Sequence, residues 1–154
     1  MANVEQKIAA LGLELPPCAA PVGSYVPAVR TGKLVFTAGQ LPLRGGTLIA
    51  TGKVPHDVPL DTAQAAARQA ALNALAAVRS VAGSLDNVAR VVRLNVFVNS
   101  TSGFTEQAKV ANGASDLLVQ VFGDAGRHTR CAIGAAELPL HAPVELDLVV
   151  ELES

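Results

Sequence analysis

A long helix-forming segment at residues 61–83, "DTAQAAARQAALNALAAVRSVAG", lies between two groups of strand-forming segments, and this order constrains the fold more than any other feature. The segment is rich in residues of high helix propensity, begins with an acidic residue and ends at a glycine. Leu72, Leu75 and Val78 fall on one stripe of the expected helix, with alanines beside them. This stripe of small side chains suits close packing of a helix on a sheet.

The segments on either side predict a mixed sheet. Two strand-forming runs flank "RTGK" at residues 30–33, which predicts a hairpin, and a β-branched strand is expected at 87–100. A second helix is expected over residues 105–123, with Gly113 weakening its middle. Residues 126–152 are interpreted as a closing hairpin of a short apolar strand, a proline turn and a longer strand. This order predicts an α+β fold with both helices on one face of a mixed sheet.

The N-terminal residues precede this pattern. Asn3 can cap a short helix that stops at Gly12, and the proline-rich stretch that follows is interpreted as an extended arm. A chain of 154 residues is long enough for one domain and too short for two ordinary ones. We therefore expect a single domain of residues 1–154, in which the helix and arm of 1–19 precede a core of 20–152.

The last strand alternates in a way that leaves a second face to be covered. Its apolar face carries Val144, Leu146, Leu148, Val150 and Leu152, whereas its other face mixes carboxylates with a valine. If both helices pack on the apolar face, the opposite face of the sheet is only partly polar. Such a surface favours self-association.

Composition excludes several classes of function. The net charge is −1 with no basic run, and the chain has one Tyr, four Phe and no Trp, so we expect no nucleic-acid partner. No stretch of about 20 apolar residues exists, so we expect no membrane partner and a cytoplasmic location. The two cysteines have no zinc spacing, and the histidines at 56, 128 and 141 are scattered without carboxylates at metal spacing, so no metal is expected.

Five residues can carry chemistry, and each also has a plain structural interpretation. Arg130, at the mouth of the first closing strand, can hold a carboxylate in two hydrogen bonds or can lie in solvent. Glu145 can orient or deprotonate a water, or can be a solvated strand residue. Gly39 after a strand permits close approach of another group or marks a bulge. Tyr25 can present its hydroxyl at an interface or pack in a rim, and Cys131 can be a reactive thiol or a small strand residue. Ser115 has no G-x-S-x-G context, so a hydrolase triad is not expected.

In combination, "SYVPAVRTGKLVFTAGQLP", "VVRLNVFVNS" and "RCAIGAAELPLHAPVELDLVVEL" resemble the reactive intermediate deaminase family, also called the YjgF family. The similarity covers roughly residues 20–152 and points to a divergent subgroup. The resemblance implies a chorismate-mutase-like fold and a homotrimer with clefts between neighbouring subunits. It also implies hydrolysis of amino-acid-derived imines and enamines, such as 2-aminoacrylate, to ketoacid and ammonia without a cofactor.

The resemblance also implies roles for the candidate residues. Arg130 takes the place of the arginine that binds the substrate carboxylate, and Glu145 takes the place of the glutamate that helps to position the attacking water. Tyr25 takes the place of the tyrosine near the cleft, and Gly39 takes the place of the cleft glycine. Glu145 and Tyr25 are thus the expected catalytic residues, whereas Arg130, Gly39 and Cys131, which lies beside Arg130, are expected to bind the substrate. The alternative is a trimer that binds a small carboxylate or ketoacid without catalysis. An endoribonuclease role, a label that some family members carry, has little support in this charge and composition.

The expected closing hairpin gives one geometric prediction. If its turn is centred near Leu140 and His141, Glu145 lies opposite Ala136, and Arg130 is about 20 Å away along the strand. One chain would then not bring Arg130 and Glu145 to one small ligand. We therefore expect that, if the two residues share a site, they come from different subunits.

Overall fold

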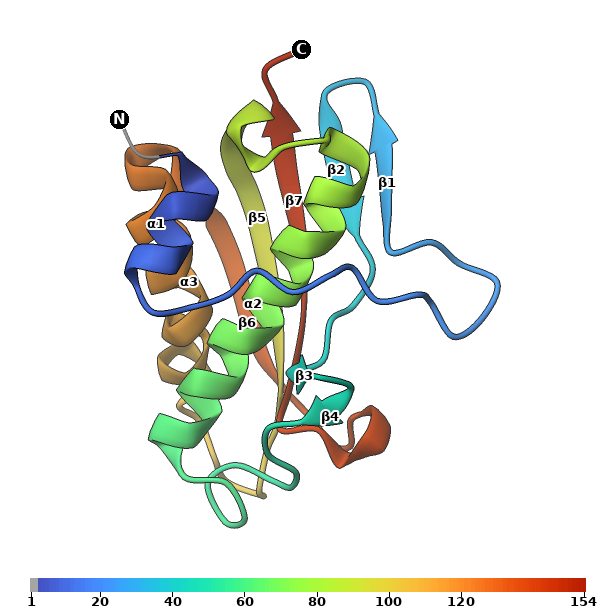
Figure 1. The fold of residues 1–154 in the computed structure, drawn as a ribbon. Coiled ribbons are helices and arrows are strands. Elements are labelled where there is room, and N and C mark those ends of the chain that lie inside the picture. Colours follow the sequence, from blue (N-terminus) through green and yellow to red (C-terminus); the bar gives the residue numbers. More distant parts are fainter. Residues whose placement is uncertain (1–2) are drawn as a thin grey trace.

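The computed structural model describes residues 3–154 and shows a mixed five-stranded sheet with its helices on one face (Figure 1). This confirms the predicted α+β class. A separate two-stranded hairpin lies beside the lower end of the sheet. The helices are α1 (Val4–Ala10), α2 (Leu60–Ala82) and α3 (Gln107–Phe122), and the strands are β1 (Ala28–Thr31), β2 (Leu34–Thr37), β3 (Leu43–Arg44), β4 (Thr47–Leu48), β5 (Val88–Asn99), β6 (Thr129–Ala135) and β7 (Val144–Leu152).

The strands of the main sheet are ordered β1-β2-β7-β5-β6. The predicted first hairpin is confirmed, because β1 pairs antiparallel with β2 and Thr31 faces Leu34 across a two-residue turn. Gly32 in that turn has a φ of 59°, a conformation that glycine adopts without steric cost. β1 and β6 form the two opposite edges of the sheet.

The predicted closing hairpin is wrong. β6 pairs parallel with β5, whereas β7 pairs antiparallel with β5 on its other side and with β2. The physical reason is the unit β5–α3–β6, in which a crossover helix places two consecutive strands parallel and adjacent. The chain then passes over the end of β5, where the Asn99 N–H donates to the Pro143 carbonyl at 2.9 Å and the buried Asn99 side chain donates to the Ala142 carbonyl at 3.1 Å.

The predicted glycine stops and the Asn3 cap are confirmed, but α3 begins at Gln107 and not at residue 105, and its N-cap Glu106 forms no side-chain capping bond. α1 begins with Asn3, whose side chain accepts from the Gln6 N–H while the Gln6 side chain accepts from the Asn3 N–H. α2 ends where Gly83 takes a positive φ, and α3 ends at Gly123 in the same way. No helix among residues 3–154 is long and apolar enough to cross a membrane.

Small residues bring the two long helices close to the sheet and to each other. α2 buries a row of alanines together with Leu72 and Leu75. On α3, a β-carbon added to Gly113 would lie 2.0 Å from the backbone carbonyl oxygen of Gln64 on α2. Gly113, which costs helix propensity, is therefore the residue that permits this helix–helix distance.

The predicted alternation of β7 is confirmed. The face of β7 that carries the even-numbered residues, from Val144 to Leu152, is buried against the helices. The face that carries the odd-numbered residues is half-buried. The half-buried face belongs to an open side of the sheet that no element of residues 3–154 covers (Figure 1). Val29, Phe36 and Ile133 lie on this open face and are between 41% and 52% exposed. This open face is the surface on which the candidate site lies.

Candidate functional site

Glu145 is the second residue of β7 and points to the open face of the sheet. Its carboxylate packs against Gly39: a β-carbon added there would lie 2.5 Å from a carboxylate oxygen. The segment is held in place because the Gln40 N–H donates to the Leu146 carbonyl at 2.7 Å and the Leu146 N–H donates back at 3.1 Å. The structure therefore brings two predicted site residues, Gly39 and Glu145, into contact.

The environment of Glu145 favours its protonated form. Burial, and then the negative charge of Asp147, raise the pKa of the Glu145 carboxyl above its ordinary value of 4.5. Asp147 lies on the same face of β7, and its side chain accepts a hydrogen bond of 2.8 Å from the Asn95 amide on β5. A carboxyl group with a raised pKa can both accept and return a proton, which suits general acid–base work.

Apolar side chains from the neighbouring strands flank this carboxylate. Phe97 on β5 is the register partner of Glu145, and Ile133 on β6 is the register partner of Phe97. Cys131 lies on the same open face, opposite Asn95, and is exposed. Glu145 and Cys131 thus share a face, two strands apart.

Arg130 points to the other side of the sheet, toward α3. One nitrogen of its guanidinium, Nη1, donates to the Asn112 side-chain oxygen at 2.8 Å and to the Ser115 hydroxyl at 3.1 Å. Both acceptors are neutral, so the positive charge of Arg130 is oriented without being neutralised. Its remaining N–H groups have no partner among residues 3–154 and can donate to an anion at the β6 edge of the sheet.

His128 completes the support of this arginine. Its Nδ1 lies 2.6 Å from the carbonyl oxygen of Gly126, which can only accept, so Nδ1 carries a hydrogen in the neutral ring. Nε2 then accepts from the Ser115 hydroxyl at 2.9 Å. The oxygen of Ser115 then accepts a hydrogen bond from Arg130. The donor and acceptor roles are thus fixed along the whole hydrogen-bond chain from Arg130 through Ser115 and His128 to Gly126.

Arg130 and Glu145 do not meet within one chain. In the register, Arg130 pairs with Leu94 and Glu145 with Phe97, three residues apart on β5, so their side chains lie on opposite faces. Two strand spacings and three residues of strand rise separate their backbones by about 14 Å. The hairpin reasoning that gave about 20 Å is therefore wrong, but the residues remain apart for a different reason.

Tyr25 precedes β1, at the edge of the sheet opposite β6, and is 54% exposed. It lies away from Arg130 within the chain. Within residues 3–154, no group of three or more His, Cys, Asp or Glu side chains is arranged to hold a metal ion.

Sequence reasoning missed the residues that support the candidates. Asn112, Ser115 and His128 hold Arg130, and Asp147 acts on Glu145. Asp147 carried a signal, because it stands two residues after Glu145 on a strand and must share its face. The α3–β6 contact carried none, because a helix face and an edge strand meet only through the tertiary fold.

Comparison with known proteins identifies the family. A family model described as "YjgF/chorismate_mutase-like, putative endoribonuclease" matches residues 5–152. The chain belongs to the YjgF family. This confirms the resemblance seen in the sequence, and it places the fold among chorismate-mutase-like folds.

The relatives of this YjgF-family protein differ in their degree of likeness. It is 47% identical to Protein TCP17 of Trypanosoma cruzi, over 99% of this chain and 96% of that protein. It is 28% identical to a 2-iminobutanoate/2-iminopropanoate deaminase of Dermatophagoides farinae, over 86% of this chain and 89% of that protein.

Solved structures also include one of higher and one of lower similarity to this chain. Atu1372 of Agrobacterium tumefaciens is 43% identical with a TM-score of 0.91, covering 97% of this chain and 92% of that one. TdcF of E. coli with bound serine is 24% identical with a TM-score of 0.64, covering 89% and 94%. The relative named as a deaminase is thus less similar to this chain than TCP17 and Atu1372 are, which indicates a divergent subgroup of the YjgF family.

Proposed function

We propose that this protein is a hydrolytic deaminase of amino-acid-derived imines and enamines, working in clefts between the subunits of a homotrimer. The observation that carries the proposal is the Glu145 carboxyl, partly buried, with a raised pKa, and packed against Gly39 on the open face. The name of the Dermatophagoides farinae relative gives the same reaction class for a family member.

The second element of the proposed site is Arg130. Its guanidinium is held by neutral acceptors and keeps donors for the carboxylate of an imino acid. Because Arg130 and Glu145 lie on opposite faces of the sheet in one chain, a shared ligand requires Glu145 from a second copy at the β6 edge. The exposed apolar side chains of the open face support such an association.

The chemistry asks little of the protein. The carbon of a C=N bond is already electrophilic, and an enamine reaches the imine by proton transfer to carbon. The substrate carboxylate would bind Arg130. The water oxygen would bond to the imine carbon while Glu145 takes a proton from that water, and Glu145 would then pass the proton to the imine nitrogen. In the carbinolamine that forms, the hydroxyl proton moves to nitrogen by way of Glu145, the C–N bond breaks and the C=O bond forms, which gives the ketoacid and ammonia. Tyr25, Gly39 and Cys131 would line the cleft and contact the substrate.

Two other functions are a carboxylate-binding protein without catalysis and an endoribonuclease. The first is binding of a small carboxylate without catalysis. Ala132, two residues after Arg130 on the same side of β6, has no ionisable group, and a cleft that only binds a carboxylate would need none there. The endoribonuclease description of the family fits less well, because a net charge of −1 without a basic run is not typical of a nucleic-acid-binding protein.

The test is imine hydrolysis by the purified protein. An amino-acid oxidase generates the imine, and ketoacid and ammonia formation are followed with and without the protein. We expect acceleration that falls at least about a hundredfold in Arg130→Ala and in Glu145→Gln. Saturable ketoacid binding without any acceleration would instead establish the binding protein.

A further inference from the structure

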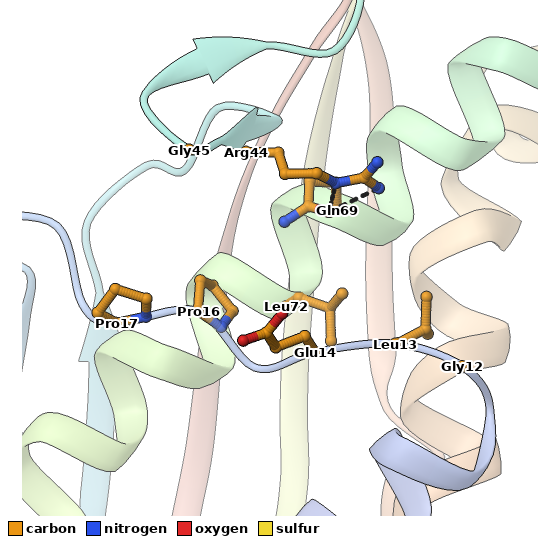
Figure 2. A pocket seen from close by; sticks show the side chains of 9 residues that line it. All are labelled: Gly12, Leu13, Glu14, Pro16, Pro17, Arg44, Gly45, Gln69 and Leu72. Carbon is orange, nitrogen blue, oxygen red and sulfur yellow. Dashed lines mark hydrogen bonds between the residues drawn. The ribbon is translucent and has the colours of Figure 1, made fainter.

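A cavity of about 530 Å³ lies on the helix side of the molecule, away from the proposed deaminase site. The N-terminal arm, the β3–β4 hairpin and α2 line it, and it is open to solvent (Figure 2). Its volume falls in the range of small-molecule sites. Leu72 on α2 and Leu13, Pro16 and Pro17 on the arm provide apolar walls.

Arg44 of β3 brings a fixed positive charge to this cavity. Its Nε and Nη2 both donate to the side-chain oxygen of Gln69, at 3.2 and 3.1 Å, as the dashed lines in Figure 2 show. Gln69 is only 5% exposed, and its amide nitrogen donates to Asn73 at 3.2 Å. Asn73 in turn donates to the carbonyls of Leu41 and Leu43. Carbonyls only accept, so this chain is directional and presents an oxygen to Arg44.

The anchoring leaves the other edge of the guanidinium unused. Gln69 takes the Nε–Nη2 edge, and the Nη1–Nη2 edge has no hydrogen-bond partner and no ion pair among residues 3–154. That edge is a planar fork of two donors, which matches a carboxylate. A neutral anchor orients the fork without cancelling its charge.

Glu14 of the arm adds a carboxylate to the same cavity. It is exposed and forms no ion pair with Arg44 or with another described residue. A ligand that carries one carboxylate, one ammonium group and an apolar body would satisfy Arg44, Glu14 and the walls together. A free dianion would be repelled by Glu14.

We propose that this cavity binds an amino acid with an apolar side chain, with its carboxylate on Arg44, its ammonium group near Glu14 and its side chain against Leu72 and the prolines. The site is distinct from the proposed deaminase site, because Arg44 and Gln69 belong to the hairpin and to α2, whereas Glu145 lies on the open face. The inference does not depend on deaminase activity.

The test is binding of L-leucine to the intact protein, followed by calorimetry and by amide chemical shifts. We expect saturable binding below about 10 mM, with shifts at Gly12 and Gly45, which line the cavity. Isocaproate, which lacks the amine, and isopentylamine, which lacks the carboxylate, should each bind at least about tenfold more weakly. Absence of leucine binding in this range would overturn the proposal.

Matched variants locate the site. Arg44→Gln should weaken leucine binding at least about tenfold, and Arg44→Lys should do so while retaining the charge. Arg68→Gln removes the same charge from an exposed position beside Gln69, outside the cavity lining, and should have no effect. Glu14→Gln, at an exposed residue, should remove the preference for leucine over isocaproate.

An Arg130→Ala background separates this site from the proposed deaminase site. Leucine binding should persist there with the same shifts at Gly12 and Gly45. Binding that disappears in Arg130→Ala but survives in Arg44→Gln would place leucine elsewhere and overturn the proposal, whatever the outcome for imine hydrolysis.

Discussion

At the scale of single residues, the environment of Glu145 lowers the stability of the fold at neutral pH, and this residue is the proposed catalytic one. Its pKa is raised in the folded state, first by burial and then by Asp147. The stability linked to its protonated form is present below the unfolded-state pKa and is lost as pH rises through the folded-state pKa. At neutral pH the ionised carboxylate is therefore a cost to folding.

Glu145→Gln should accordingly raise the free energy of unfolding at pH 7 by about 1 kcal/mol or less, since the group is only half buried. Below about pH 4 the difference should vanish, because the carboxyl is then protonated in both states. Urea unfolding at several pH values measures it. A variant less stable than the wild-type protein at pH 7 would contradict this reading of the site.

Gly39→Ala tests the contact that defines the candidate site. The added methyl would lie 2.5 Å from a Glu145 oxygen, so the carboxylate must move. The φ of Gly39 is not in the left-handed region, so the backbone accepts alanine. We expect imine hydrolysis to fall about tenfold or more with an almost unchanged melting temperature. Full activity would show that the carboxylate position is irrelevant.

The candidate residues could be chosen from the sequence, but their grouping could not. Gly39 and Glu145 are far apart in the chain and meet because the segment after β2 bridges to β7 through Gln40 and Leu146. The substrate-binding role of Arg130 stays a prediction. Its acceptors on α3 depend on a helix–strand contact that no local pattern encodes.

At the scale of elements, α3 holds Arg130 through Asn112 and Ser115. Asn112→Ala removes one hydrogen bond from the charged guanidinium to a neutral acceptor on the protein surface. We expect KM for the imine to rise about fivefold with little change in kcat. Gln120→Ala, exposed on the same helix, is the control. An equal effect of both variants would assign the change to the helix and not to the arginine.

The α2–α3 contact depends on Gly113. In Gly113→Ala the new methyl would lie 2.0 Å from a backbone oxygen of α2, which cannot turn aside as a side chain does. We expect a loss of about 3 kcal/mol in the free energy of unfolding, despite the helix propensity of alanine. Denaturant unfolding beside Asp116→Ala, an exposed change on α3, measures it. Equal midpoints for the two variants would contradict the tight contact.

Elements defined by local signals were predictable, and those defined by pairing were not. Glycine stops gave the helix ends, the Asn3 cap gave the start of α1, and "RTGK" gave the first hairpin, because these signals lie within a few residues. The closing hairpin failed because a proline turn between two strands does not reveal whether they pair. The order strand, helix, strand at β5–α3–β6 carried the better signal, since it favours parallel neighbours.

At the scale of the whole molecule, the uncovered face of the sheet and the separation of Arg130 from Glu145 both favour association of subunits. The open face carries the exposed apolar residues Val29, Phe36 and Ile133. The two site residues lie on opposite faces within a chain. The proposed trimer would both cover the face and complete the site, and the sequence alone could suggest this only through family resemblance.

Subunit complementation tests this directly. Arg130→Ala and Glu145→Gln proteins, each inactive toward imines, are unfolded together in equal amounts and refolded. If each cleft takes Arg130 from one copy and Glu145 from its neighbour, each mixed trimer regains both residues in one of its three clefts, which is about a quarter of all clefts in the refolded mixture. We predict about a quarter of wild-type activity in the mixture and none in either variant refolded alone. A mixture that forms mixed oligomers, shown by mass spectrometry, yet stays inactive would contradict a site shared between subunits.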